Sequence, residues 1–322
     1  MRKNVNTAHI EGRIYQHDLE VKEVKNQASA NFGKKYIGGT IEVATDEAGM
    51  NIVPVSFTYV TETTSNGGKN KTYAEMMKII TSGKTWMGNS PAEATMVSID
   101  TSIALNDFVA SDDSMVSQQI HQGGFVTVVP NLKDEAIRNT FKTDILITNV
   151  NRVEADPERH IDEDYVTVRG AIFNFKNDLL PVEYVVKNPA GMAYFEGLDA
   201  SSAEPVYTQV WGRINFAAAN VQVVTESAFG GAESSTVDVR ARKVRQWVVT
   251  GASKVPYDFG DESVMTEDEL IKAMQDRQVH LADVKKRREE YKQQKAAATP
   301  AASFGAAPTA NVAPAAPGKF TF

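Results

Sequence analysis

The sequence predicts a mainly β protein with two five-stranded barrels in tandem, followed by a C-terminal helix and a disordered tail. Two observations lead to this fold class. Residues 10–15 alternate between apolar and polar side chains around a central glycine, as expected of a strand that bends into a small closed barrel. Short segments in the second half of the chain resemble segments of the first half in the same order, which indicates a duplicated barrel.

The duplication rests on three pairs of similar segments. They are residues 12–15 with 170–173, residues 90–93 with 201–204, and residues 147–156 with 249–258. Alternating strands resemble one another, so any single pair could be a coincidence. The common order of the three pairs favours two copies of one barrel.

The elements of the first barrel follow from alternation and turn residues. We expect strands at residues 10–15, 36–43, 51–60, 95–109 and 144–150, with the last of these closing the barrel. A helix is expected at residues 73–80, because Met76, Met77 and Ile80 share one helical face. Gly38 and Gly39 indicate a bend or bulge, and residues 111–139 form an excursion with one short strand.

The second barrel and the C-terminal segments continue the pattern. Strands are expected at residues 165–175, 181–187, 206–216, 221–225 and 237–250. Thr266 and Glu269 form a capping box, which predicts a helix that packs on the second barrel or makes a short coiled-coil contact between protomers. The alanine- and proline-rich tail that follows cannot bury a core and is expected to be disordered.

These elements divide the chain into four expected parts. They are a first barrel with long insertions at residues 1–157, a second barrel at 158–260, a helix at 264–295 and a tail at 296–322.

Composition limits the environment and the chemistry. The chain of 322 residues has a formal net charge of −7 and no cysteine, which excludes disulfides and thiolate metal sites and favours a reducing cytoplasm. The start lacks the apolar core of a signal peptide, and no apolar run approaches the length of a membrane span, so no membrane partner is expected.

No catalytic signature is present. The segment Ser82-Gly83-Lys84-Thr85 resembles the end of a phosphate-binding loop, but position 78 is Lys78 where that motif requires glycine. We therefore expect a protein that is not an enzyme and that uses no cofactor and no metal. A metal-dependent nuclease built on loop carboxylates, such as those of Asp112 and Asp113, is the weakest alternative.

Aromatic and basic residues are interleaved on the predicted strands and loops, which is typical of proteins that bind an unpaired nucleic-acid strand. Cations follow the phosphates while aromatic rings stack on bases without reading the sequence. The candidate binding residues are Arg13, Tyr15, Lys34, Lys35, Tyr36, Tyr59, Lys69, Lys71, Trp86, Arg169, Phe173, Arg213, Arg240 and Arg242. About half of the rings in the wider pattern, which includes Trp211 and Trp247, are expected to belong to the barrel cores.

The opening strand at residues 6–15 with its Gly12-Arg13 pair, the two strands across residues 36–60, and the tail that ends in Phe322 together resemble single-stranded-DNA-binding proteins of the OB-fold type found in bacteriophages. The resemblance covers the first 60 residues well and the rest only as architecture. It implies an OB-like barrel and a tail tip, Phe320 and Phe322, that recruits replication or recombination proteins. The second barrel in one chain departs from the simple bacterial pattern and is closer to multi-barrel binders. The tip carries Lys319 and lacks the acidic run of bacterial family members.

The expected function is therefore sequence-tolerant binding of single-stranded DNA, or of RNA, during replication or recombination, in a host cytoplasm if the protein is phage-encoded. A homo-oligomer is possible. The alternative is a structural assembly protein, such as a virion component, in which the barrels serve as interaction modules. The acidic net charge slightly favours this alternative.

Overall fold

The computed structural model describes residues 4–156, 159, 161–225, 236–258 and 266–298, with backbone alone at residues 218–225, 236–243 and 295–298. Its strands are β1 (Asn6–His17), β2 (Glu20–Glu23), β3 (Lys35–Ala44), β4 (Ile52–Thr61), β5 (Met96–Val109), β6 (Met115–Val128), β7 (Asn139–Val153), β8 (Tyr165–Phe173), β9 (Leu179–Val186), β10 (Val206–Asn215), β11 (Ala218–Thr225), β12 (Thr236–Lys243) and β13 (Gln246–Ala252). Its helices are α1 (Lys71–Ser82), α2 (Pro189–Glu196) and α3 (Glu267–Ala298), with a short 3-10 helix η1 (Glu135–Ile137). The mainly β prediction is confirmed.

Five strands close into the first ring, in the order β1-β3-β4-β6-β5 and back to β1. β4 and β6 run parallel, whereas the other neighbours in the ring are antiparallel. α1 lies between the third and the fourth strand of the ring along the chain. This strand order, with a helix at that point, is the arrangement of an OB-fold barrel.

The second ring repeats the first, in the order β7-β8-β9-β13-β10 and back to β7, with β9 and β13 parallel. α2 again lies between the third and the fourth strand. This helix was not predicted from the sequence, although Asn188 caps it and Pro189 occupies its first turn, both ordinary start signals. The chain therefore contains two OB-like barrels, as predicted.

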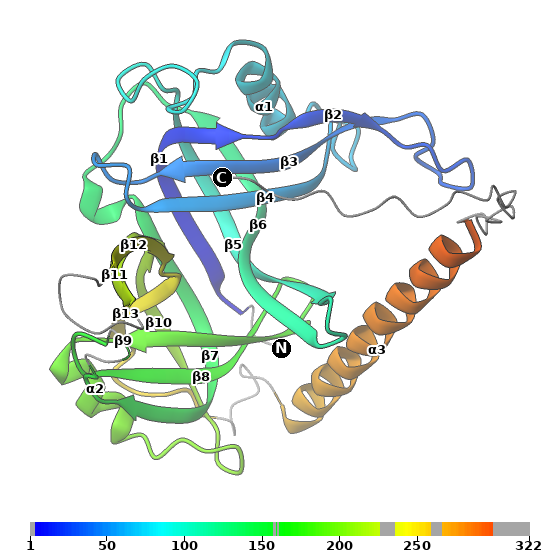
Figure 1. Ribbon diagram of the computed structural model, residues 1–322. Coiled ribbons are helices and arrows are strands. Elements are labelled where there is room, and N and C mark those ends of the chain that lie inside the picture. Colours follow the sequence, from blue (N-terminus) through cyan, green and yellow to red (C-terminus); the bar gives the residue numbers. More distant parts are fainter. Residues whose placement is uncertain (1–3, 157–158, 160, 226–235, 259–265, 299–322) are drawn as a thin grey trace, which may run out of the picture.

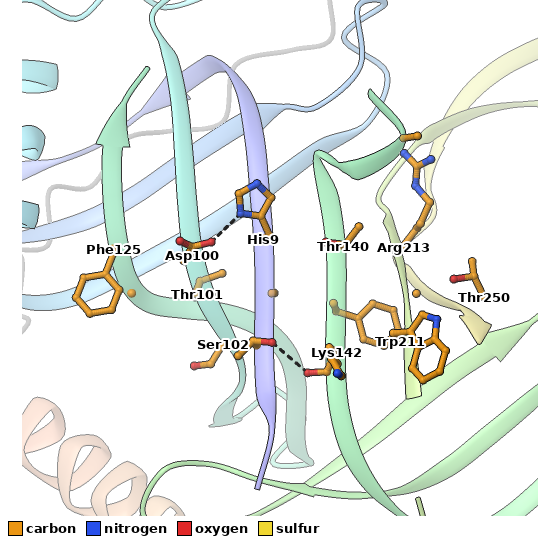
Figure 2. Close-up of a pocket in the computed structure, with 16 residues that line it drawn as sticks. His9, Asp100, Thr101, Ser102, Phe125, Thr140, Lys142, Trp211, Arg213 and Thr250 are labelled. Atoms are coloured by element: carbon orange, nitrogen blue, oxygen red, sulfur yellow. Dashed lines mark hydrogen bonds and ion pairs between the residues drawn. The ribbon is translucent and has the colours of Figure 1, made fainter. Parts of the chain in front are cut away.

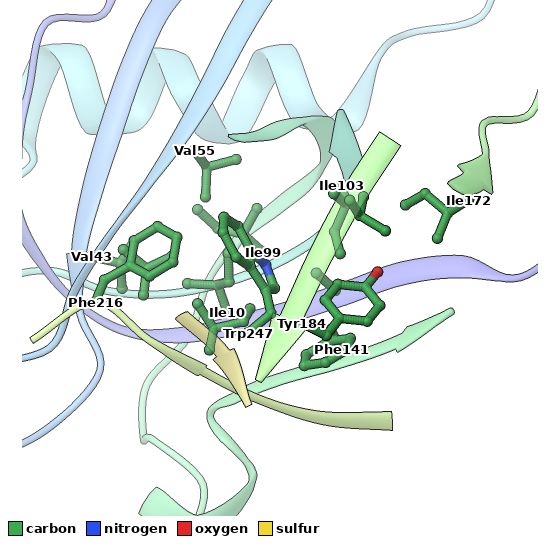
Figure 3. Packing of buried hydrophobic residues seen from close by; sticks show 14 of the residues in the cluster. Ile10, Val43, Val55, Ile99, Ile103, Phe141, Ile172, Tyr184, Phe216 and Trp247 are labelled. Atoms are coloured by element: carbon green, nitrogen blue, oxygen red, sulfur yellow. The ribbon is translucent and has the colours of Figure 1, made fainter. Parts of the chain in front are cut away.

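The two barrels share one continuous sheet (Figure 1). β1 pairs with β7 from Asn6 opposite Thr143 to Ile10 opposite Asn139. Buried side chains from both rings form one hydrophobic cluster, in which Ile10 and Ile99 of the first ring lie near Phe141 and Trp247 of the second (Figure 3). The side chain of Asn51 also links the two barrels, and we call this link the Asn51 clasp. Its Nδ2 donates to the Ile214 carbonyl at 3.0 Å, and its Oδ1 accepts from the backbone amide of Phe216 at 2.8 Å.

The mid-strand glycines mark close backbone approaches. A Cβ on Gly12 would lie 2.1 Å from the Ala44 carbonyl oxygen, and one on Gly170 would lie 2.1 Å from the Leu146 oxygen. No side chain fits at such distances, so both strands can coil tightly against their neighbours only with glycine. A register shift in the neighbouring strand pairing accompanies each glycine.

The strand pairing corrects the expected closure of the first barrel. β7, which contains the segment predicted to close that barrel, pairs with β8 and β10 and closes the second ring. β6 closes the first ring, from within the stretch that was predicted to be an excursion. The division into domains stays a prediction. Because β7 belongs to the second ring, we now expect the boundary between the barrels before Asn139 and no longer between residues 157 and 158.

The pairing also shows which repeat matches are structural. Residues 90–93 and 201–204 both precede the fourth strand of their ring. Residues 12–15 belong to the first strand of one ring, whereas residues 170–173 end the second strand of the other. The remaining pair matches β7 with β13, a first strand with a last one. Only the middle pair therefore joins equivalent elements.

α3 begins at the predicted capping box, in which Thr266 accepts from the Glu269 amide and Glu269 accepts from the Thr266 amide. The helix contacts β5 of the first barrel and β9 of the second, beside the far end of the β5–β6 hairpin (Figure 1). It therefore packs on both barrels, whereas packing on the second was expected. Within the described part of the chain, no helix combines the length and the apolar character needed to cross a membrane.

His121 lies fully buried at the contact between the barrels. Its ring is 5.6 Å from the rings of both Phe216 and Trp247, and Trp247 Nε1 donates to His121 Nε2 at 3.1 Å. Burial lowers the pKa of His121 from 6.5 to about 4, against a smaller opposite effect of the Pro54 backbone. The imidazole is therefore neutral in the folded protein at pH 7.

We expect acid to destabilise the protein through His121. Between pH 6.5 and about pH 4 the unfolded chain binds a proton at this residue that the folded chain does not, so stability is complete above this range and falls as the pH falls through it. At about 1.4 kcal/mol per pKa unit, the loss is about 3 kcal/mol. The check is urea unfolding across this pH range for the native protein and for His121→Gln, which keeps an acceptor for Trp247. Parallel pH profiles for the two proteins would contradict the expectation.

Candidate functional site

The face of the first barrel formed by β3 and β4 carries a pair of tyrosines. The ring centroids of Tyr36 and Tyr59 lie 4.7 Å apart at an interplanar angle of 40°. Tyr59 is 44% exposed and Tyr36 is half-buried, so the pair combines a fixed geometry with ring surface open to solvent. In OB-folds, the face of the second and third strands, which are β3 and β4 here, is the one that binds oligonucleotides.

Four of the lysines predicted to bind lie near the start of β3 and beyond the end of β4. Lys34 and Lys35 directly precede Tyr36, and Lys34 Nζ donates to Asn31 Oδ1 at 3.0 Å. Lys69 and Lys71 follow the end of β4, where an isolated bridge joins Thr63 to Lys69. All four side chains are exposed, and none forms an ion pair within the described ranges. The structure therefore brings together Lys34, Lys35, Tyr36, Tyr59, Lys69 and Lys71 at one end of the β3–β4 face.

Arg13, Tyr15 and Trp86 form a separate cluster on the outer side of β1. The rings of Tyr15 and Trp86 lie 6.3 Å apart, and Arg13 Nη1 donates to the Ala92 and Ala94 carbonyls, each at 3.4 Å. The Trp86 indole also lies against Gly49, where an added Cβ would come within 2.8 Å of the ring. These three side chains are half-buried and fasten the loop before β5 onto β1.

The predicted residues of the second barrel are dispersed. Arg169 is exposed on β8 and forms an ion pair with Glu183 of β9. Phe173 is only 1% exposed and packs against Ala273 of α3, so its prediction as a binding residue is wrong. The cause is that α3, about one hundred residues later in the chain, covers a face that alternation alone would leave open. Arg240 and Arg242 lie on β12, and their side chains are outside the described residues, as are Phe320 and Phe322.

A groove of about 690 Å³ crosses the junction between the barrels on the outer face of β5, β1, β7 and β10 (Figure 2). One row of the sheet runs from Phe125 on β6 through Asp100, His9 and Thr140 to Arg213 on β10. Lys142 and Trp211 are paired residues of the next row. Phe125 is 73% exposed and Trp211 is 40% exposed, although hydrophobic side chains of this size are usually buried.

The charges of the groove are partly paired. Asp100 Oδ1 lies 2.7 Å from His9 Nδ1, and His9 Nε2 lies 3.3 Å from Glu11 Oε2. Burial alone would raise the pKa of Glu11, but the backbone amide and the ammonium group of Lys133 outweigh it and hold that pKa below its usual value. Arg213 donates from Nε and Nη2 to Asn139 Oδ1, at 3.1 and 2.7 Å. Its guanidinium group is therefore held in a fixed orientation at the groove.

Among the groove residues, Arg213 alone was predicted from the sequence to bind. The alternation of Trp211 and Arg213 along one strand is a signal that places the two on one face. Phe125 and Lys142 carry no comparable signal, since they come together only through the β1–β5 and β1–β7 pairings, which connect distant parts of the chain.

Comparison with known proteins assigns a family. A family model described as YorF matches residues 4–287. The chain belongs to the YorF family. No curated protein matches it.

One solved structure similar to this YorF family member is a deletion mutant of the single-stranded DNA binding protein from Thermus aquaticus. The match covers 81% of this chain and 100% of that chain, at 12% sequence identity and a TM-score of 0.44. At that TM-score the likeness supports no conclusion about the function of the YorF chain.

The described residues of this YorF protein contain no group of three or more His, Cys, Asp or Glu side chains able to hold a metal ion. The β3–β4 face and the groove each present exposed aromatic ring surface next to cations, and the two barrels behind them share one hydrophobic core.

Proposed function

We propose that this protein binds single-stranded DNA without sequence preference, through the β3–β4 face of its first barrel. The observation that carries the proposal is the Tyr36–Tyr59 pair, partly exposed and bordered by four lysines that no described carboxylate neutralises. Stacking of a base on such a ring contributes about 1–3 kcal/mol and tolerates every base, because each base has a π face. The lysines supply the attraction for phosphates.

The net charge of −7 does not oppose this proposal. Association with a phosphate backbone depends on the cations that lie within about 8–10 Å of it, since salt screens charges farther away. The local group of Lys34, Lys35, Lys69 and Lys71 therefore matters more than the sum over the chain. The same dependence predicts that binding weakens as salt rises.

The wider role belongs to the same proposal. The likeness of the opening strand and of the phenylalanine-tipped tail to phage proteins of this kind supports a role in replication or recombination, in the cytoplasm of a host cell. We extend the proposal to recruitment of a partner protein through Phe320 and Phe322. RNA as a second ligand and self-association are compatible with it.

The test is a competition experiment. A labelled oligo-dT strand bound to the full chain is challenged with unlabelled single-stranded DNA, with RNA of the same length, and with a duplex. The proposal expects the single strand to compete far better than the duplex, whose bases are not free to stack. Equal competition by the duplex, or no binding of oligo-dT at low salt, would end it. Large regular assemblies in the absence of DNA, seen by light scattering, would instead favour an assembly protein.

A further inference from the structure

We propose that the groove between the barrels is a second binding site for single-stranded nucleic acid, separate from the Tyr36–Tyr59 face. The inference rests on the proposed function, because it takes the same class of ligand to a different surface. In the ring order β1-β3-β4-β6-β5, the β5 side of the barrel lies across from the β3–β4 face. A strand held at both places must wrap around the first barrel, and two short strands can bind separately.

Two of the aromatic side chains that line the groove are exposed, and one of them, Trp211, is held in place. The Trp211 indole lies against the backbone of Gly251 on β13, where an added Cβ would come within 2.4 Å of the indole nitrogen. Gly251 thus provides the space that seats the ring, and 40% of Trp211 stays exposed. Phe125 stands on β6 at the other side of the groove with 73% of its surface exposed (Figure 2). A ring seated as Trp211 is offers a stacking surface at low entropic cost.

The cations of the groove match an anionic strand. Lys142 is exposed beside Trp211 and forms no ion pair within the described ranges. Arg213 is oriented by Asn139, which is itself buried and donates to the Ile214 carbonyl at 2.7 Å. Asp100 is the carboxylate among the residues that line the groove, and its Oδ1 lies 2.7 Å from His9 Nδ1. A nucleic-acid strand that crosses from Phe125 to Trp211 therefore meets the cations of Lys142 and Arg213. These cations favour an anionic ligand over an uncharged apolar peptide.

The platform under the groove is rigid. The groove spans β6, β5, β1, β7 and β10, and the paired β1 and β7 at its centre come from different barrels. Four strand spacings separate Phe125 from Trp211, which corresponds to about 19 Å across the sheet. The Asn51 clasp and the shared core prevent the barrels from moving apart. The spacing of the strands that carry Phe125 and Trp211 is therefore set before a ligand arrives.

The test uses the full chain and an oligo-dT of about 8 nucleotides, which is short enough to occupy one surface at a time. The native protein is expected to bind two such strands, and the double variant Trp211→Ala with Lys142→Gln to bind one. Trp211→Ala alone is expected to weaken the groove site roughly 5- to 150-fold. Lys142→Gln alone is expected to reduce the slope of log affinity against log salt by about 1.

Matched controls come from α3, which lies outside both surfaces. Tyr291→Ala removes an exposed ring and Lys272→Gln an exposed cation, and neither should change the stoichiometry or the affinity. Lys142→Gln replaces a surface side chain, so it tests the groove even if Trp211→Ala affects folding. Unchanged stoichiometry and salt slope in the Trp211 and Lys142 variants would overturn the groove site while leaving the Tyr36–Tyr59 face intact. Failure of the native protein to bind any oligo-dT would overturn the proposed function as well.

Discussion

Replacing both Tyr36 and Tyr59 by alanine is expected to lower the affinity for a short oligo-dT strand by about 2–6 kcal/mol, since each stacked base contributes about 1–3 kcal/mol. The two rings lie 4.7 Å apart, so the single substitutions need not add up to the double one. Removal of either ring also frees its neighbour to move. The measurement is fluorescence anisotropy at fixed salt for both single variants and the double variant.

Two controls separate stacking from folding in this experiment. Tyr36→Phe with Tyr59→Phe keeps both ring faces and should retain most of the affinity. Thermal unfolding should be little changed in the alanine variants, because Tyr59 is 44% exposed and Tyr36 is half-buried at the end of the barrel. Native affinity in the double alanine variant, made in a protein whose groove also carries Trp211→Ala and Lys142→Gln, would show that the β3–β4 face does not bind the strand.

Arg277→Ala is expected to release α3 from the barrels. Arg277 donates to both carboxylate oxygens of Asp107 at 2.6 Å, and the two side chains are 10% and 4% exposed. Burial alone would raise the pKa of Asp107, but hydrogen bonds from Arg277 and Ser117 outweigh it and hold that pKa below its usual value. Without Arg277 the buried carboxylate keeps only Ser117 and His280 as neighbours, with His280 Nε2 3.2 Å from Oδ2. Removing one partner of a buried ion pair costs about 3–5 kcal/mol.

The chain can avoid this cost by letting α3 detach, because water then reaches Asp107. We therefore expect amide hydrogens of α3 to exchange much faster in Arg277→Ala, with smaller changes in the barrels. Lys292→Ala is the matched control. Lys292 also joins α3 to the first barrel, through an ion pair with Asp113, but this pair lies in solvent, with side chains 47% and 66% exposed. Such pairs contribute about 0–1 kcal/mol. Equal exchange in the two variants would show that the Asp107–Arg277 pair does not anchor the helix.

The features that depend on residues close together in the sequence were predicted correctly. The capping box at Thr266 and the apolar face of α1 are local patterns, and the structure contains both helices. A bend of the opening strand was predicted from its central glycine, because glycine weakens the middle of a strand, and in the structure another backbone segment passes close to Gly12 and to Gly170. Tyr36 and Tyr59 were named separately as binding residues, and the pairing of β3 with β4 brings them together.

The errors concern residues that lie far apart in the chain. Alternation places Phe173 on one side of a strand but does not show that α3 covers that side. Similar strands also made β7 seem to close the first ring, although closure depends on β6 and on a parallel pairing with β4. The groove between the barrels was missed for the same reason, since it exists only because β1 pairs with β7.

The most direct test of the binding face is photocrosslinking. An oligo-dT strand that carries iododeoxyuridine is bound to the full chain and irradiated, and the modified peptides are identified by mass spectrometry. Because this base reacts with aromatic rings on which it stacks, binding at the β3–β4 face predicts adducts at Tyr36 or Tyr59, which disappear when an excess of unlabelled oligo-dT is added. Adducts confined to other regions of the chain, with none at either tyrosine, would contradict it.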